Sequence, residues 1–369
     1  MRLLDATFAV VLGITLGSSF MVCAALIATQ KWHGRFSLDH DTTGAQKIHR
    51  QPVPRVGGIA IALSLAIGAA LAYSLHSPDG LSMATLLICA TPTFAAGLLE
   101  DLTKQISVRM RLAASMASAL ATIYLLDAQL VEVDTPLLDT LMDFGMLAML
   151  FTCFAVSGVI NSINIIDGVN GLASGSVVIM LGGLGSIAWM QGDSLVLHLC
   201  LGGIAALLGF MALNYPFGKI FLGDGGAYLA GFWLAECAVL LLKRNPDVST
   251  WAVLLCCIYP VWETGYSMYR RHMVNRVNSG MPDMLHIHHL VLHHYSTLRE
   301  HAWAPSWLLH AMTSSSIWMM VLLCQAVAVS GYLDTALMMP CVMAFGLLYQ
   351  LIYAPLAGSS SKQPQNILG

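Results

Sequence analysis

Two long apolar runs and the polar stretch between them decide the fold. Residues 140–160 read TLMDFGMLAMLFTCFAVSGVI, residues 161–170 read NSINIIDGVN, and residues 171–190 read GLASGSVVIMLGGLGSIAWM. A helix that crosses a bilayer needs about 20 mainly apolar residues, and in hydrocarbon the backbone must form helices or a closed barrel. Barrel strands alternate in polarity and are only about 10 residues long. The stretch therefore predicts two membrane-spanning helices joined by a polar turn.

The composition of the whole chain agrees with a membrane protein. Of the 369 residues, 57% are hydrophobic and 10% are charged, whereas a soluble domain carries about 25% charged residues. This excludes intrinsic disorder, which requires low hydrophobicity and high charge. The net charge of −3, without a basic domain, argues against a nucleic-acid partner. The nine cysteines lie in apolar runs without a CxxC spacing, which indicates small buried side chains rather than disulfides or a zinc ribbon.

Eleven apolar runs of this kind predict an all-α, polytopic fold in a single integral-membrane domain over residues 1–369. They cover residues 6–30, 57–75, 81–99, 112–126, 140–160, 171–190, 195–213, 227–242, 250–269, 306–330 and 335–355. The first run is too long for a cleavable signal peptide and leads into further spans. Residues 356–369 are expected to form a flexible tail.

The loops between these runs differ in charge. One alternating set of loops, together with the C-terminal tail, holds fourteen of the seventeen lysines and arginines; the loops cover residues 31–56, 100–111, 161–170, 214–226 and 270–305. Because cytoplasmic loops carry the excess of Lys and Arg, we expect this set in the cytoplasm. The N-terminus is then outside and the C-terminus inside. Most of the histidines and polar motifs lie in the same loops, which predicts a catalytic cleft at the cytoplasmic face.

The first polar motif, KIHRQPVPRVGG, lies just before the second apolar run. Its two prolines favour an extended approach, and Gly57 and Gly58 allow backbone or phosphate to come close. Lys47, Arg50 and Arg55 gather positive charge at the mouth of the span. The motif fits anion binding, and it fits equally well a loop whose charges only set the topology.

The second motif is a pair of adjacent acids, Glu100 and Asp101, at the end of an apolar run. A charge in mid-membrane costs roughly 2.5–3.5 kcal/mol on insertion scales, so the pair is expected at the interface or in a wet cavity. Lys104 shares a helical face with Glu100, and Arg111 follows. One interpretation is an ion pair at a helix end. The other is a metal or phosphate site, or a base, in which one carboxyl raises the pKa of its neighbour.

The third motif is a polar stripe with a period of three residues, formed by Asn161, Asn164, Asp167 and Asn170. Between two apolar runs such a stripe is costly unless it binds something. Amide and carboxylate oxygens are hard ligands that suit Mg²⁺. We therefore favour a ligand-binding turn over an ordinary loop.

The fourth motif, FLGDGG, places one carboxylate among glycines at the start of an apolar run. The free N–H groups of a helix N-terminus attract anions, and Asp224 could anchor a metal ion between the protein and a phosphate. Phe221 offers a flat face for a nucleobase.

The fifth motif, HIHH, begins at His286 in the longest inner loop. A zinc site needs three or four converging ligands, and the His–Glu–x–x–His pattern is absent. We favour binding of an anion such as a diphosphate by His286 and His288 over structural zinc or plain surface histidines.

Together, and in this order, the five motifs resemble the polyprenyl-phosphate N-acetylhexosamine-1-phosphate transferase family. This is glycosyltransferase family 4, which includes the undecaprenyl-phosphate GlcNAc-1-phosphate and phospho-N-acetylmuramoyl-pentapeptide transferases. The match runs from Lys47 to His289 and looks most like the O-antigen and capsule branch. There are two departures: the family usually has Asp where this chain has Glu100, and many bacterial members have Asp where Asn170 stands.

The resemblance implies a reaction at the bacterial inner membrane. A HexNAc 1-phosphate from UDP-GlcNAc or a related UDP-HexNAc would pass to undecaprenyl phosphate, with release of UMP, as the first membrane step of O-antigen or cell-envelope polysaccharide synthesis. The implied cofactor is Mg²⁺, which Mn²⁺ could replace. Membrane lipids are the other expected partners, and a homodimer is compatible with the sequence.

The resemblance also implies roles for individual residues. Asp224 and Asn164 would hold Mg²⁺, while Asp101 and Glu100 would position or deprotonate the lipid phosphate and Asp167 would order the asparagine stripe. Phe221 and Asn170 would meet the uracil, and His286, His288 and Arg111 would contact the diphosphate. Lys47, Arg50 and Arg55 would gather the lipid phosphate or the sugar nucleotide. Asn161 and Lys104 are further expected substrate contacts.

Two other classes of protein remain open at this stage. A secondary transporter also carries polar residues within apolar helices, although it tends to show inverted repeats and sites near mid-membrane. A membrane protein that binds lipid phosphate without turnover would share the charged mouth but release no UMP.

Overall fold

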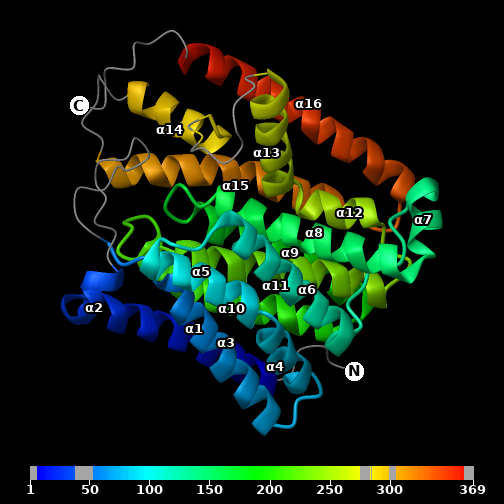
Figure 1. The fold of residues 1–369 in the computed structure, drawn as a ribbon, viewed down its shortest axis with the longest axis horizontal. Helices are drawn as coiled ribbons and strands as arrows, with labels where there is room; N and C mark the ends of the chain where they lie inside the picture. The colour runs from blue at the N-terminus through cyan, green and yellow to red at the C-terminus, as the bar shows by residue number, and fades with distance from the viewer. Residues whose placement is uncertain (1–5, 38–52, 275–282, 284, 299–304, 361–369) are drawn as a thin grey trace.

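The computed structural model describes residues 6–37, 53–274, 283, 285–298 and 305–360, and every regular element within these ranges is a helix (Figure 1). The all-α prediction is thereby confirmed. Lys47 and Arg50 lie outside the described residues. All nine cysteines are free thiols and eight of them are buried, as their apolar surroundings predicted.

One helix, α11 (Gly223–Arg244), forms the centre of the bundle. It is almost entirely buried, as expected for a helix that is apolar on all sides. Among the helices that pack around it, those with the most extensive contacts are α3 (Gly57–Ser74), α5 (Thr91–Thr103), α8 (Gly145–Ile165), α9 (Leu172–Gln191) and α10 (Ser194–Asn214). The outer helices, which are mostly exposed on the surface of the bundle, are α1 (Ala6–Ala28), α15 (Ser306–Ser330) and α16 (Thr335–Ser360).

Within the described ranges, eight helices are long and apolar enough to cross a membrane, or nine if one bent pair counts as a span. The bent pair is α4 (Gly80–Cys89) and α5, which meet at 48°. The predicted run at 112–126 belongs to the longer helix α6 (Val108–Leu126), which is not among the eight. The polytopic prediction is confirmed, whereas the count of eleven spans is not.

The predicted span at 250–269 is broken into two helices, α12 (Thr250–Cys256) and α13 (Ile258–Tyr269), followed by the π-helix η1 (Arg270–Val274). Pro260 explains the break, because it has no N–H to donate to the carbonyl of Cys256. That carbonyl instead accepts a hydrogen bond of 2.9 Å from Nε2 of Gln325 on α15.

Polar residues gather at the two ends of the bundle. The described parts of the loops predicted to share the inner side lie toward one end, near α2 (Gln30–Ser37) and α14 (Ile287–Leu298), at the left of Figure 1. The opposite end, near α7 (Pro136–Met142), contains ion pairs such as Arg244–Asp193 at 2.7 Å. The expected tail is corrected at its start, because residues 356–360 still belong to α16.

Glycines allow α3 and α5 to approach the start of α11 closely. A Cβ atom on Gly58 would lie 2.4 Å from the backbone nitrogen of Gly226, and one on Gly97 would lie 2.7 Å from the backbone of Asp224. These contacts are backbone to backbone, so no side chain can move aside to make room.

We therefore expect Gly58→Ala to lower the free energy of unfolding by about 1–3 kcal/mol, the usual cost of overpacking. Gly13→Ala on α1 is the matched control, because a Cβ there meets nothing within 4 Å. Thermal unfolding of the purified protein in detergent measures both. Equal melting temperatures for the two variants would contradict the close packing of α3 on α11.

Candidate active site

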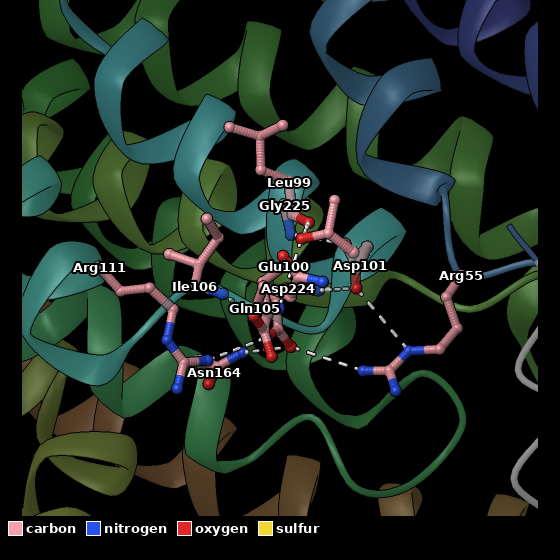
Figure 2. A network of polar contacts seen from close by, with 11 residues as sticks. Arg55, Leu99, Glu100, Asp101, Gln105, Ile106, Arg111, Asn164, Asp224 and Gly225 are labelled. Atoms are coloured by element: carbon pink, nitrogen blue, oxygen red, sulfur yellow. Dashed lines mark hydrogen bonds and ion pairs between the residues drawn. The ribbon is translucent and has the colours of Figure 1, made fainter. Parts of the chain in front are cut away.

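Asp224 is the centre of a polar network at the end of the bundle where the predicted inner loops meet (Figure 2). It lies in the first turn of α11, directly after Gly223, whose positive φ of 73° favours glycine. Its carboxylate accepts hydrogen bonds from Arg111 Nη1 at 3.0 Å and from Asn164 Nδ2 at 3.1 Å. Nη2 of Arg55 lies 3.5 Å from the same carboxylate. Three segments far apart in the sequence thus converge on one side chain.

Asp101, from α5, holds the helix end on which Asp224 sits. Its two carboxylate oxygens accept hydrogen bonds, each 2.9 Å long, from the backbone N–H groups of Asp224 and Gly225. Nε of Arg55 lies 3.8 Å from one of these oxygens, and Asp101 is only 6% exposed. Free N–H groups at a helix N-terminus attract negative charge. The Asp101 carboxylate therefore stabilises the start of α11 and fixes the position of Asp224.

Glu100 precedes Asp101 but has a different environment. Its Oε2 accepts a hydrogen bond of 2.8 Å from the backbone N–H of Ile106, and the residue is half-buried. Helix α5 ends at Thr103, and the next residue, Lys104, is left-handed with a φ of 57° and is exposed. Of the two acids, Glu100 is therefore the more accessible, whereas Asp101 is buried and hydrogen-bonded to the backbone of α11.

The PxPRxGG motif pairs with the FLGDGG motif through the backbone. The N–H of Phe221 donates to the carbonyl of Pro54 at 2.8 Å, and the carbonyl of Phe221 accepts from the N–H of Gly57 at 3.0 Å. The close backbone approach expected from the glycines is therefore present. The same pairing brings the guanidinium of Arg55 beside Asp224 (Figure 2).

The side-chain amides of the asparagine stripe donate hydrogen bonds to different acceptors. Asn164 faces the network, whereas Nδ2 of Asn161 donates to the carbonyl of Ser157 in its own helix at 2.7 Å. Asn170 is buried, and its Nδ2 donates to the carbonyl of Pro216 at 3.0 Å. The regular spacing in the sequence thus does not produce a single row of free amides.

Asp167, in the turn between α8 and α9, lies within the field of the same charges. Loss of hydration raises the pKa of its carboxyl to about 7; the positive charge of Arg55 opposes this shift, and the negative charges of Asp224 and Asp101 add to it. A carboxyl with a pKa near neutrality is sensitive to any charge that arrives beside it. Asp167 therefore belongs electrostatically to the site.

The histidine motif reaches this turn from α14. A Cβ on Gly168, which follows Asp167, would lie 2.5 Å from Nε2 of His288 and 3.2 Å from Nε2 of His289. His288 is fully buried, and burial lowers its pKa well below the ordinary value, while the pKa of His289 falls to about 4. Both rings are therefore neutral at pH 7, and each has one N–H to donate.

His286 points elsewhere. Its Nδ1 donates a hydrogen bond of 2.8 Å to Oε1 of Glu263 on α13, and its ring lies parallel to that of His288 with the centroids 5.5 Å apart. The sequence favours His286 and His288, but in the structure His288 and His289 are the residues packed on the turn after Asp167. The motifs do not point to Glu263, although it is the one acid in the apolar run 250–269.

The donor atoms at the site fit one kind of metal ion. Within the part of the chain that the structure describes, no three His, Cys, Asp or Glu side chains are grouped closely enough to hold a metal together. Zinc needs three or four such ligands. Mg²⁺ is commonly bound by one or two carboxylates together with substrate phosphates. The oxygens of Asp224, Asn164 and Asp167 therefore fit Mg²⁺ shared with a phosphate better than an all-protein metal site.

Comparison with known proteins supports the resemblance seen in the motifs. The family model for glycosyl transferase family 4 matches residues 83–242. The chain is 29% identical over 255 residues to the probable undecaprenyl-phosphate N-acetylglucosaminyl 1-phosphate transferase of Bacillus subtilis, covering 68% of this chain and 69% of the relative. It is 28% identical over 269 residues to the undecaprenyl-phosphate alpha-N-acetylglucosaminyl 1-phosphate transferase of Escherichia coli K12, covering 70% and 71%. The segment 83–242 is therefore glycosyl transferase family 4 sequence, and the similarity to these transferases extends over about two thirds of the chain.

The structure extends the site beyond the matched segment. The acids, the asparagine and one arginine of the network lie within residues 83–242. Arg55 precedes that segment, and the histidines follow it. The site is therefore completed by chain on both sides of the matched region.

Asp101→Asn tests the contact between Asp101 and α11. Both oxygens of Asp101 accept from backbone N–H groups, so an amide must turn its NH₂ toward one of these donors. We expect a loss of about 1–3 kcal/mol in unfolding free energy, the cost of a buried donor left without a partner.

Glu100→Gln is the matched control for this loss. Only one oxygen of Glu100 accepts the N–H of Ile106, and the glutamine carbonyl can replace it. Thermal unfolding in detergent compares the two variants with the wild type. A loss in Glu100→Gln equal to that in Asp101→Asn would contradict the capping role of Asp101.

Proposed function

We propose that this protein transfers an N-acetylhexosamine 1-phosphate from a UDP-sugar, UDP-GlcNAc or a related UDP-HexNAc, to undecaprenyl phosphate. The products are UMP and undecaprenyl-diphosphate-HexNAc. The relatives are undecaprenyl-phosphate N-acetylglucosaminyl 1-phosphate transferases, which supports undecaprenyl phosphate as acceptor and a sugar 1-phosphate as the transferred group. The observation that carries the proposal is the position of Asp224 at a helix N-terminus between Arg55 and Arg111.

The reaction exchanges one phosphate–oxygen bond for another. An oxygen of the lipid phosphate attacks the phosphorus that bears the sugar, and the bond from that phosphorus to UMP breaks. Both reactants are anions that repel each other, so the protein must supply positive charge where they meet. Arg55 and Arg111 supply it on both sides of Asp224. Since the second pKa of a phosphate monoester is about 6, the lipid phosphate needs positioning more than a strong base.

The two adjacent acids, Asp101 and Glu100, have different roles in this reaction. Asp101 is occupied by the backbone of α11 and acts by holding Asp224. Glu100 is the more accessible acid, and we propose that it faces the lipid phosphate.

Mg²⁺ is the proposed cofactor, and Mn²⁺ is expected to replace it. Asp224 and Asn164 would hold the ion, and Asp167 would add a second carboxylate nearby. When bound, the ion would neutralise charge on the diphosphate. Arg55 and Arg111 would then contact phosphate oxygens around the same carboxylate.

The remaining predicted substrate contacts are part of the proposal. Uracil would meet Phe221, Asn170 and Asn161, next to the FLGDGG motif and in the asparagine stripe. The diphosphate would meet His286 and His288 of the histidine motif. The outer cations, Lys47, Arg50 and Lys104, would attract both substrates.

We place the site at the cytoplasmic face of a bacterial inner membrane, in the first membrane step of O-antigen or other cell-envelope polysaccharide synthesis. The excess of Lys and Arg in the loops that meet at the site supports this orientation. A homodimer is compatible with the mostly exposed outer helices.

A panel of radiolabelled UDP-sugars with undecaprenyl phosphate tests the proposal. We expect Mg²⁺-dependent, chloroform-soluble product and UMP in equal amounts with at least one UDP-HexNAc, because the site combines a metal ligand with two cations. Accumulation of a UDP-sugar in proteoliposomes without product would instead indicate a transporter. Lipid-phosphate binding without UMP release would indicate a binding protein.

Asp224→Ala is expected to lower kcat by at least about 10²–10³-fold, the usual effect of removing one main electrostatic group from an active site. The control is Asp127→Ala, which removes an aspartate that pairs with Lys243 at 3.2 Å, at the opposite end of the bundle. UMP release at matched protein levels measures both. Substantial turnover by Asp224→Ala would remove Asp224 from the metal site.

A further inference from the structure

A second buried carboxylate, Glu263 on α13, holds the start of α14. Glu263 is 1% exposed. Its Oε1 accepts hydrogen bonds from Nδ1 of His286 at 2.8 Å and from the backbone N–H of Ile287 at 3.3 Å. Its Oε2 accepts from the hydroxyl of Tyr349, which is fully buried on α16, at 2.8 Å. One side chain thus connects three helices.

The contact controls where the histidine motif lies. Helix α14 has no acidic residue in its first turn, so Glu263 provides the negative charge that a helix N-terminus favours. The same turn carries His288 and His289, which pack against Gly168. Because a helix is stiff over one turn, any movement at Ile287 carries both rings away from Gly168.

Only a carboxylate suits this position. The His286 ring N–H, the Ile287 N–H and the Tyr349 hydroxyl all donate to it. An ionised carboxylate only accepts, whereas an amide would turn its own N–H₂ toward one of them. The bond from Nδ1 also fixes the tautomer and the rotation of the His286 ring.

We propose that Glu263 and Tyr349 are positioning residues for the donor diphosphate. Through His286 and the start of α14 they place His288 and His289 beside the turn that contains Asp167. The inference rests on the proposed function, in which the histidine motif contacts the diphosphate. Tyr349 lies in the last helix, far outside residues 83–242, so the C-terminal span takes part in substrate binding.

Kinetics can distinguish positioning from a purely structural role. A variant that merely folds less well has fewer active molecules, so kcat falls and KM stays the same. A displaced histidine motif weakens contacts to the UDP-sugar, so KM for that substrate rises while KM for undecaprenyl phosphate stays unchanged.

Tyr349→Phe is the mildest test, because it removes only the hydroxyl. We expect KM for the UDP-sugar to rise about fivefold, the effect of one hydrogen bond. Tyr353→Phe is the matched control: it lies one turn further along α16, and its buried hydroxyl has no hydrogen-bond partner among the described residues. The control is expected to keep the wild-type KM.

Glu263→Gln is expected to lower kcat/KM for the UDP-sugar by about 10–100-fold, and Glu263→Asp, which keeps the carboxylate, to recover part of it. Calorimetric titration with UDP measures binding without turnover and should show the same order of affinities. If Glu263→Gln does not fold, the KM and the UDP affinity of Tyr349→Phe test the positioning role instead.

The outcomes separate the two proposals. A wild-type protein that makes no product refutes the proposed function. In that case the UDP affinities of the wild type and the Glu263 variants still test whether Glu263 positions the histidine motif. Unchanged KM and unchanged UDP affinity in Tyr349→Phe, in a protein that does turn over, would overturn the positioning role.

Discussion

The contact between the Asp101 carboxylate and the N-terminus of α11 is the one on which the rest of the site depends. Burying a charge is costly unless it is paired and hydrogen-bonded. Two backbone N–H groups, the dipole of α11 and Arg55 satisfy Asp101. In return, the most buried helix of the bundle begins at a fixed point, with Asp224 in its first turn. Arg111 and Asn164 then reach Asp224 from neighbouring helices.

The same arrangement recurs at α14. There Glu263 holds the start of the helix, and the residues that face the site, His288 and His289, lie in its first turn. In both places a buried acid from one helix fixes the beginning of another. The N–H groups at the start of α11 and the N–H of Ile287 at α14 already donate to these two acids. The positive charge that remains for a phosphate substrate therefore comes from Arg55 and Arg111 beside Asp224.

Much of the fold follows from the sequence because long apolar runs in a bilayer must be helical. The break in the run at 250–269 depends on Pro260 together with a hydrogen bond from Gln325, and no apolar pattern shows that pairing. The number of spans is equally hard to predict, because the bent pair of α4 and α5 is as apolar as a straight span.

The motifs indicate the residues of the network but not which contact each residue makes. Asp101 and Glu100 look alike in sequence, and only the structure shows that one caps α11 while the other is accessible. Asn170 fits the polar stripe, yet its amide binds the carbonyl of Pro216. Glu263 has no motif around it, so its link to the histidines appears only when distant helices are packed together.

Binding of Mn²⁺, followed by electron paramagnetic resonance in the presence of a UDP-sugar, shows whether Asp224, fixed by Asp101, holds the metal ion at the diphosphate. We expect bound Mn²⁺ in the wild type, weaker binding in Asp101→Asn and none in Asp224→Ala. Mn²⁺ bound equally well by the wild type and Asp224→Ala would contradict this role of Asp224.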